Sequence, residues 1–297
     1  MKNLCSYIKN FQEFNLPKYK YSAITFCNKL GEGATGSVYK CFVYGKLVTI
    51  KIFDIINYLD VSSFVDDVYN EMYISNLLKK AIYSINIIGY SIYNRLKDVK
   101  IYLIYDNHNK SIDMRQFISN KYNKSKYILS NKDKLSIIQQ FIYGLKEIKE
   151  KRITHCDIKL ENIIIYKENN QYKIKYIDFG GSCYMENNMY DSSEYDYNFG
   201  TEGYMPIEAY NKKIYFSSDI YALSICILEV LIGKIWDKGV NYTNCRKEVK
   251  TSLNNINNKK IKNYLIKCLS ENYKIRPNIY DLEDTLINHL HQELVVN

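Results

Sequence analysis

The first third of the chain alternates between hydrophobic and polar residues in short runs. Runs rich in β-branched and aromatic residues cover 21–30, 37–44, 47–53, 87–93 and 99–105. Runs of this kind, bounded by glycine and polar residues, are typical of half-buried strands. One helical stretch interrupts them at 64–79, where an apolar stripe follows a group of acidic residues. We therefore expect a β-rich unit that contains one helix.

The pattern changes to a helical period after residue 110. Apolar residues at three- and four-residue spacing predict helices over 112–118, 135–148, 220–231 and 279–290. Two short β-type runs, 163–166 and 172–177, separate the second helix from the third. The second part of the chain is therefore expected to be larger and mostly helical.

Composition and charge narrow the class of protein. The chain has 297 residues, 46% of them hydrophobic and only three of them proline, which is typical of a folded globular protein. Its formal net charge is +9, but no block of five or more basic residues occurs, so we expect a solvated basic surface and no direct nucleic-acid binding. The eight cysteines form no C-x-x-C pair, which indicates neither a zinc site nor a disulfide framework.

Targeting signals are not evident. Residues 1–20 lack the apolar core of a signal peptide. The most apolar segment, 220–236, contains Glu229 and falls short of a membrane span. These features predict a soluble, cytoplasmic protein.

Polar motifs after the long helix are candidates for chemistry. Asp157 and Asn162 stand five residues apart on a predicted loop, so a carboxylate and an amide can face one pocket. Asp178-Phe179-Gly180 follows at the end of a predicted strand. A carboxylate there suits magnesium, because this hard cation prefers oxygen ligands.

A glycine motif lies in the β-rich part. Gly31, Gly33 and Gly36 form G-x-G-x-x-G, which alone can also mark a hairpin or a dinucleotide site. A strand with Val38 follows the glycines instead of a helix, and Lys51 ends the later run Val48-Thr49-Ile50-Lys51. Glycines allow the backbone N–H groups to approach phosphates closely.

In this order, the motifs resemble those of eukaryotic-type protein kinases of the serine/threonine class over about residues 21–290. The resemblance implies an α+β, bilobal kinase-like fold, with a small β-rich N-lobe containing one helix and a larger, mostly helical C-lobe. It implies an N-terminal extension over 1–20, an N-lobe over 21–105, a hinge over 106–110 and a C-lobe over 111–297. It also implies ATP and Mg²⁺ as cofactors and a protein substrate as partner, while the oligomeric state stays open.

The resemblance assigns roles to individual residues. Asp157 would accept the proton of the substrate hydroxyl, Lys159 would neutralise charge on the γ-phosphoryl, and Thr201 matches the serine/threonine class. Lys51, held by Glu71, would orient the phosphates. Asn162 and Asp178 would hold magnesium. The remaining positions expected at the nucleotide are Gly31, Gly33, Gly36, Val38, Asp106, His108 and Ile164.

Four departures from the family pattern support one alternative, a pseudokinase that acts as a nucleotide-binding regulatory scaffold: Thr49, Ser75, Cys156 and Ile207. A second alternative is a phosphotransferase of the same fold that acts on small molecules or lipids. Cys156 replaces the arginine that usually pairs with a phosphorylated activation segment, here 181–198, so we expect activity without strict dependence on a phosphate. The resemblance further pairs Glu208 with Arg276 and places Asp219 beneath the catalytic loop.

Overall fold

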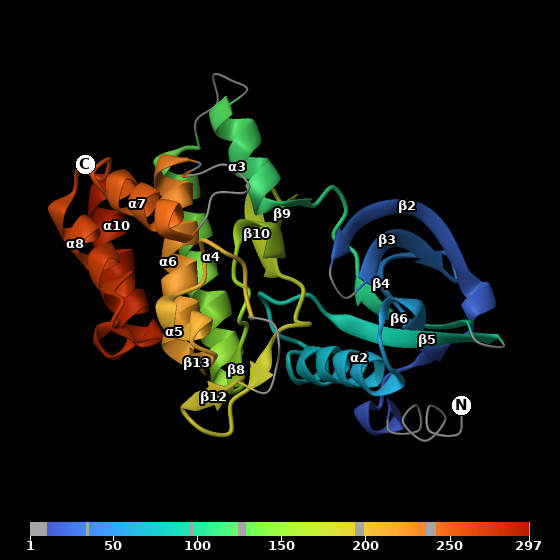
Figure 1. The fold of residues 1–297 in the computed structure, drawn as a ribbon. Coiled ribbons are helices and arrows are strands. Elements are labelled where there is room, and N and C mark those ends of the chain that lie inside the picture. The colour runs from blue at the N-terminus through green and yellow to red at the C-terminus, as the bar shows by residue number, and fades with distance from the viewer. Residues whose placement is uncertain are drawn as a thin grey trace. The chain divides into compact units, whose positions relative to one another are not determined.

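The computed structural model describes residues 11–33, 36–95, 98–123, 129–193, 199–233, 235 and 242–296. The chain divides into two compact units, Met1–Asn109 and Lys110–Asn297. Figure 1 shows that the first unit is built mainly of strands and the second mainly of helices. This division agrees with the change of hydrophobic period after residue 110.

The first unit contains a six-stranded sheet in the order β1-β5-β6-β4-β3-β2. Its neighbouring strands pair antiparallel, except that β1 runs parallel to β5. The helix α2 (Val61–Leu77) contacts β4 and β5. The strands are β1 (Lys18–Tyr19), β2 (Ile24–Gly33), β3 (Gly36–Val43), β4 (Lys46–Asp54), β5 (Ile87–Arg95) and β6 (Asp98–Asp106).

Residues 11–19 pack onto this first unit. Phe11 and Phe14 are buried in the 3-10 turn η1 (Phe11–Phe14), and the Phe14 ring lies 5.1 Å from that of Tyr69 on α2. The Tyr90 N–H donates to the carbonyl oxygen of Pro17 at 3.0 Å. These contacts add residues 11–19 to the core of the unit, while residues 1–10 lie outside the described part. The domain boundaries at 20, 105 and 110 stay a prediction.

Two predicted elements are wrong at their first residues. Tyr21–Ala23 form the 3-10 turn η2, because the Ala23 N–H donates to Lys20 O and closes a turn before β2. Ile112–Asp113 form the strand β7, which pairs with the strand β9 (Ile163–Glu168), and the helix α3 (Met114–Asn123) begins only afterwards. The Asp113 carboxylate accepts from Gln116 N–H at 2.7 Å, so it caps the helix that was predicted to include it.

Two long helices form the core of the second unit. α4 (Asn131–Glu150) contacts α6 (Phe216–Ile232), whose residues 218–230 are all buried. A helix that is apolar on all sides needs such a central position. The other helices are α5 (Ile207–Tyr210), α7 (Tyr242–Leu253), α8 (Lys259–Cys268), α9 (Ile279–Asp281) and α10 (Ile287–His291), the last two joined by a π-helical turn, η6 (Leu282–Leu286). Among the described residues, none of the helices is long and apolar enough to cross a membrane.

Short ladders hold the polar motifs of the second unit. β8 (Ile153–Thr154) pairs with β11 (Cys183–Tyr184), and β9 (Ile163–Glu168) pairs with β10 (Gln171–Tyr176). A third ladder joins β12 (Met189–Asp191) to β13 (Lys213–Tyr215). The loop that carries Asp157 therefore leaves β8 and enters β9 through the turn η4 (Leu160–Asn162).

Candidate active site

Lys51 and Glu71 form a buried ion pair in the first unit. Side chains alternate along a strand, so Lys51 and Thr49 of β4 share one sheet face with their cross-strand partners Leu103 and Tyr105 of β6. Lys51 Nζ lies 2.6 Å from Glu71 Oε2 on α2, and both side chains are buried. The pairing expected from the sequence is present in the structure, while the role of the pair in phosphate binding stays a prediction.

Tyr105 is a further member of this buried group. Its hydroxyl donates to Glu71 Oε1 at 2.8 Å and lies 3.5 Å from Ser75 Oγ. Glu71 and Ser75 stand four residues apart on α2 and therefore on one helix face. Ser75 is fully buried there, and its small side chain leaves space for the tyrosine hydroxyl. Ser75, which departs from the family pattern, therefore has the Tyr105 hydroxyl as its neighbour, and Tyr105 helps to position Glu71.

Replacing Tyr105 by phenylalanine is expected to lower kcat by about tenfold, because a hydrogen bond to a charged group contributes about 1.5 kcal/mol. Steady-state kinetics with ATP and a protein substrate would measure the effect. Tyr90→Phe is the matched control, since Tyr90 is a buried tyrosine of the same sheet for which the described residues provide no hydroxyl partner. Equal kcat values for the two variants would contradict a positioning role for Tyr105.

The three glycines lie at the turn between β2 and β3, where Gly33 pairs with Gly36 and Gly31 with Val38. A Cβ atom at Gly36 would clash with the backbone oxygen of Ile52, so packing alone requires this glycine. A Cβ atom at Gly31 would meet no atom of the described residues within 4 Å, so packing against them does not require a glycine at this position. The open space at Gly31 fits a phosphate-binding role. Ala34 and Thr35 of the motif lie outside the described residues.

The end of β6 carries the residues expected near the nucleotide base. Asp106 is half-buried and accepts from Lys46 Nζ at 3.2 Å and from Asn86 Nδ2 at 3.4 Å. His108 is half-buried in the irregular segment that follows. Asn107 Nδ2 donates to Thr49 Oγ1 at 2.9 Å, so the hydroxyl that departs from the family pattern has a polar partner.

Three side chains of the second unit form a closed hydrogen-bonded triangle. Thr201 Oγ1 donates to Asp157 Oδ1 at 2.7 Å, and Lys159 Nζ lies 2.8 Å from Asp157 Oδ2 and 2.7 Å from Thr201 Oγ1. About a fifth of the Asp157 and Lys159 side chains is exposed, 22% and 20% respectively. The triangle therefore fixes the orientation of a carboxylate that solvent can still reach.

Asn162 and Asp178 offer oxygen ligands of the kind that magnesium prefers. Asn162 Nδ2 donates to the backbone oxygen of Asp157 at 2.8 Å and to its Oδ2 at 2.9 Å. This leaves Asn162 Oδ1 without a hydrogen bond among the described residues. Asp178 follows β10 with an exposed side chain and a φ of 64°, a left-handed conformation that is uncommon outside glycine. An amide oxygen and a carboxylate fit Mg²⁺.

Ile164, which was expected at the nucleotide, lies half-buried on β9, opposite Lys175 of β10.

Asp219 supports the catalytic loop from the first turn of α6. Its Oδ2 accepts from the His155 N–H at 2.7 Å and its Oδ1 from the Cys156 N–H at 3.0 Å, as the resemblance implied. Burial raises the pKa of Asp219 to about 7, although the two N–H groups act in the opposite direction. Burial also lowers the pKa of His155, whose ring lies 5.0 Å from that of Phe179.

The contribution of Asp219 to stability should fall as the pH rises. Between its ordinary pKa of 3.8 and its folded-state pKa of about 7, the folded chain holds a proton that the unfolded chain has released. The free energy of unfolding therefore falls by up to about 4 kcal/mol between about pH 4 and pH 7 because of this group. Above pH 7 the group causes no further loss. The thermal midpoint of the wild type should therefore fall relative to that of Asp219→Asn across this range. A constant difference would contradict the raised pKa.

Cys156 takes the place of the expected arginine and makes an apolar contact. Its side chain packs against the cluster of Cys183, Met185 and Ile214. Burial raises the pKa of the thiol well above its ordinary value, so the group stays uncharged. Apolar packing thus attaches part of the activation segment to the catalytic loop. The acidic and tyrosine residues of 194–198 lie outside the described residues, and independence from phosphorylation stays a prediction.

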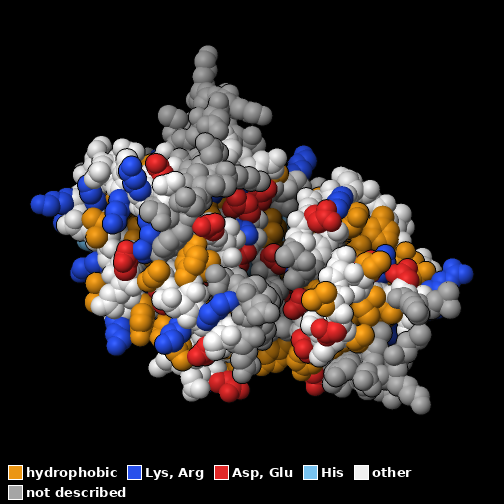
Figure 2. Space-filling model, viewed as in Figure 1, with side chains coloured by type: hydrophobic (Ala, Val, Ile, Leu, Met, Phe, Trp, Pro, Cys, Tyr) orange, Lys and Arg blue, Asp and Glu red, His pale blue; other side chains and the backbone are white. Residues whose placement is uncertain are grey.

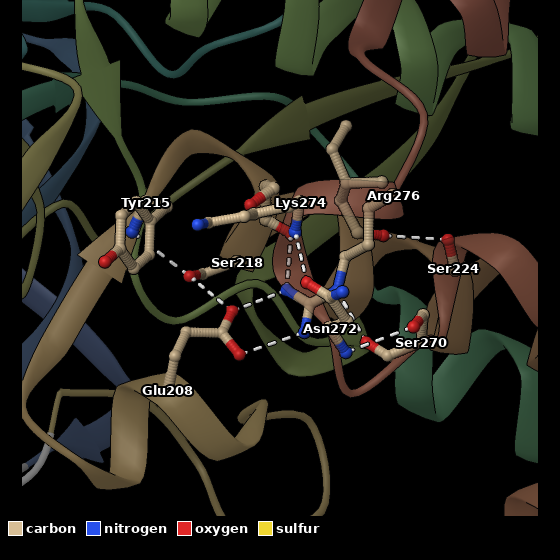
Figure 3. A network of polar contacts seen from close by, with 10 residues as sticks. Glu208, Tyr215, Ser218, Ser224, Ser270, Asn272, Lys274 and Arg276 are labelled. Atoms are coloured by element: carbon tan, nitrogen blue, oxygen red, sulfur yellow. Dashed lines mark hydrogen bonds and ion pairs between the residues drawn. The ribbon is translucent and has the colours of Figure 1, made fainter.

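The Glu208–Arg276 pair forms as predicted. Arg276 Nη1 and Nη2 lie 2.5 and 2.9 Å from the two carboxylate oxygens of Glu208, and Arg276 also donates to the backbone oxygens of Ser217 and Ser270. Figure 3 shows the Glu208 carboxylate between Arg276 and Ser218, whose hydroxyl donates to Oε1 at 3.0 Å. Ile207 begins α5 beside this pair and does not disturb it.

A further ion pair in the second unit, between Arg115 and the buried Glu229, was not predicted from the sequence. Arg115 of α3 contacts Glu229 of α6 through two hydrogen bonds, of 2.5 and 2.9 Å, and its Nε lies 3.2 Å from Glu161 Oε1. The Tyr204 hydroxyl donates to Glu229 Oε2 at 2.7 Å. A lone glutamate in an apolar helix was the available signal, because a buried carboxylate needs a cationic partner.

The structure brings the candidate residues together within each unit. In the first, Lys51, Glu71 and Tyr105 form one group, and in the second, Asp157, Lys159, Asn162 and Thr201 form another. A two-part fold with a buried lysine–glutamate pair and a loop of this composition is that of protein kinases.

Sequence comparison identifies the family. Residues 24–291 match the family model described as protein kinase domain, so the chain belongs to the protein kinase family. It is 27% identical over 266 residues to the probable serine/threonine-protein kinase WNK10 of Arabidopsis thaliana, covering 83% of this chain and 46% of that protein. It is 26% identical over 239 residues to the serine/threonine-protein kinase atg1 of Dictyostelium discoideum, covering 79% and 33%.

A third relative is the probable L-type lectin-domain containing receptor kinase S.5 of Arabidopsis thaliana. It is 26% identical over 244 residues, covering 79% of this chain and 36% of that protein. The chain thus spans about a third to a half of the length of these curated relatives.

Proposed function

We propose that this chain transfers the γ-phosphoryl group of ATP to serine or threonine hydroxyls of protein substrates. The observation that carries the proposal is the triangle of Asp157, Lys159 and Thr201, which joins a carboxylate, an ammonium group and a hydroxyl in one hydrogen-bonded set. Two of the relatives above bear serine/threonine-protein kinase in their names, which supports this acceptor class.

The proposal gives each candidate residue a separate role in phosphoryl transfer. Asp157 orients the acceptor hydroxyl and takes its proton, while Lys159 stabilises negative charge on the transferred group. Lys51, positioned by Glu71 and Tyr105, holds the phosphates in line with backbone N–H groups near Gly31 and Gly33. Asn162 and Asp178 would hold Mg²⁺, which supplies charge neutralisation on the phosphate oxygens when bound.

The scaffold alternative has little support. Three of its four indications have polar or apolar partners: Thr49 is bonded to Asn107, Ser75 lies beside the Tyr105 hydroxyl, and Cys156 packs in an apolar cluster. The fourth, Ile207, begins α5 and leaves the Glu208–Arg276 pair intact. All residues with a direct chemical role are present, and a chain without catalysis has no physical reason to retain them together.

Thermal unfolding with ATP and magnesium tests nucleotide binding. We expect ATP with Mg²⁺ to raise the midpoint more than ATP alone, and Asn162→Ala and Asp178→Ala to remove the magnesium-dependent part, since ligands that bind only the folded chain stabilise it. A midpoint that responds equally to ATP with and without the ion in the wild type would instead favour a regulatory scaffold.

A further inference from the structure

The segment from residue 52 to 78 differs in charge from the rest of the chain. It contains five acidic residues and no Lys, Arg or His, although the formal net charge of the whole chain is +9. Glu71 is buried against Lys51, whereas Asp60 and Asp66 are exposed. The surface of this segment is therefore acidic on a basic protein.

The same segment exposes large aliphatic side chains. Leu59 is fully exposed at 104%, Ile56 is 82% exposed and Val61 is 37% exposed. Single exposed aliphatic residues are common, but here three lie within six positions, and exposed aliphatic side chains gathered in this way often mark interaction sites. We call Ile56, Leu59, Asp60, Val61 and Asp66 the acidic–apolar patch. On the face drawn in Figure 2, acidic and hydrophobic side chains lie next to one another around α2.

Hydrogen bonds hold the loop that presents the patch. Asp54 accepts from the Ile56 N–H at 3.2 Å and forms an ion pair with Lys100 at 2.8 Å. The Tyr58 ring packs against Phe64 with centroids 5.3 Å apart. Asp60 caps α2 by accepting from the Ser63 N–H at 2.9 Å. Ile56 and Leu59 thus face solvent from a segment anchored on both sides.

The patch carries the negative charge of two exposed carboxylates. Asp60 and Asp66 accept hydrogen bonds from serines, and no described residue forms an ion pair with either carboxylate. The bonds from Ser63 lower the pKa of Asp60, so it is ionised at neutral pH. Two exposed carboxylates repel nucleic acid and anionic lipid and attract Lys and Arg side chains.

We propose that the acidic–apolar patch binds a basic amphipathic segment of a partner protein. Apolar side chains of that segment cover Ile56 and Leu59, and its Lys or Arg side chains face Asp60 and Asp66. This combination of an apolar stripe with flanking charge is the usual form of helix recognition. Because the patch adjoins the first turn of α2, the partner contacts the helix that carries Glu71.

Fluorescence anisotropy with a labelled synthetic peptide tests the proposal on the full chain. The probe is a helical peptide of about 14 residues, with leucines at i, i+3, i+4 and i+7 and lysines elsewhere. A peptide of the same composition in scrambled order is the reference. Ile56→Ser/Leu59→Ser removes the aliphatic part of the patch, and Ile266→Ser/Ile275→Ser is the matched control, since those aliphatic residues are 47% and 59% exposed on the other unit.

The proposal predicts that Ile56→Ser/Leu59→Ser weakens binding about tenfold or more, while the control pair changes it less than about twofold. Asp66→Asn and added salt should each weaken binding as well. Equal affinity for wild type and Ile56→Ser/Leu59→Ser, or for ordered and scrambled peptides, would overturn it. Sedimentation showing self-association that this double substitution removes would also overturn it, because the occupant would then be a second copy of the chain.

Discussion

Replacing Asp157 by asparagine is expected to lower kcat by about 1,000-fold, the scale of effect seen when a general base is removed. Asparagine keeps the shape of the side chain but cannot take the proton of an acceptor hydroxyl. The bonds from Thr201 and Lys159 hold the carboxylate in place in the wild type, and an amide can still accept one of them. Steady-state rates with saturating ATP and protein substrate would show the loss.

A matched substitution separates this chemistry from a general effect of charge. Asp98 is an exposed aspartate of β6, and its carboxylate lies 3.8 Å from Lys100 Nζ. We expect Asp98→Asn to leave kcat within about twofold of the wild type, because exposed ion pairs contribute little. An Asp157→Asn variant that retains the wild-type rate would exclude this residue as the base.

Replacing Arg276 by methionine is expected to lower the unfolding free energy by about 3 to 5 kcal/mol, the cost of removing one partner of a buried ion pair. Glu208 would remain in a buried site, where an unpaired carboxylate is unfavourable, and the exposed fractions of the two side chains are 0% for Arg276 and 7% for Glu208. Thermal and urea unfolding would record the loss as a lower midpoint.

Lys146→Met is the matched control for this prediction. Lys146 pairs with Glu283 at 2.6 Å, but both side chains are 28% exposed. Because solvent screens such a pair, we expect a loss of less than about 1 kcal/mol. If both substitutions cost the same, the Glu208–Arg276 pair is not the structural anchor that its burial indicates.

The local pattern of the sequence predicted most elements of the fold. The runs at 47–53 and 99–105 correspond to β4 and β6, and the ordered series of motifs indicated the kinase family from the sequence alone. Hydrophobic period and turn residues are local signals, which is why they were sufficient here. They failed at Ile112–Asp113, because pairing with β9 decides the conformation of those two residues.

Polar partners on distant elements could not be predicted in this way. Tyr105 stands 34 positions from Glu71 and Arg115 stands 114 positions from Glu229, and no spacing rule joins such residues. The pairs Lys51–Glu71 and Glu208–Arg276 were predicted only because the family resemblance supplied the partner. Ser75 and Thr49, which depart from the family pattern, have Tyr105 and Asn107 as polar partners in the structure.

The most direct test of the central proposal is transfer of radiolabelled phosphate from ATP, with magnesium, to generic protein substrates, followed by identification of the labelled amino acid. The proposal predicts label on serine or threonine with the wild type and almost none with Asp157→Asn. No transfer from a folded chain that binds ATP, or label that persists in the variant, would contradict it.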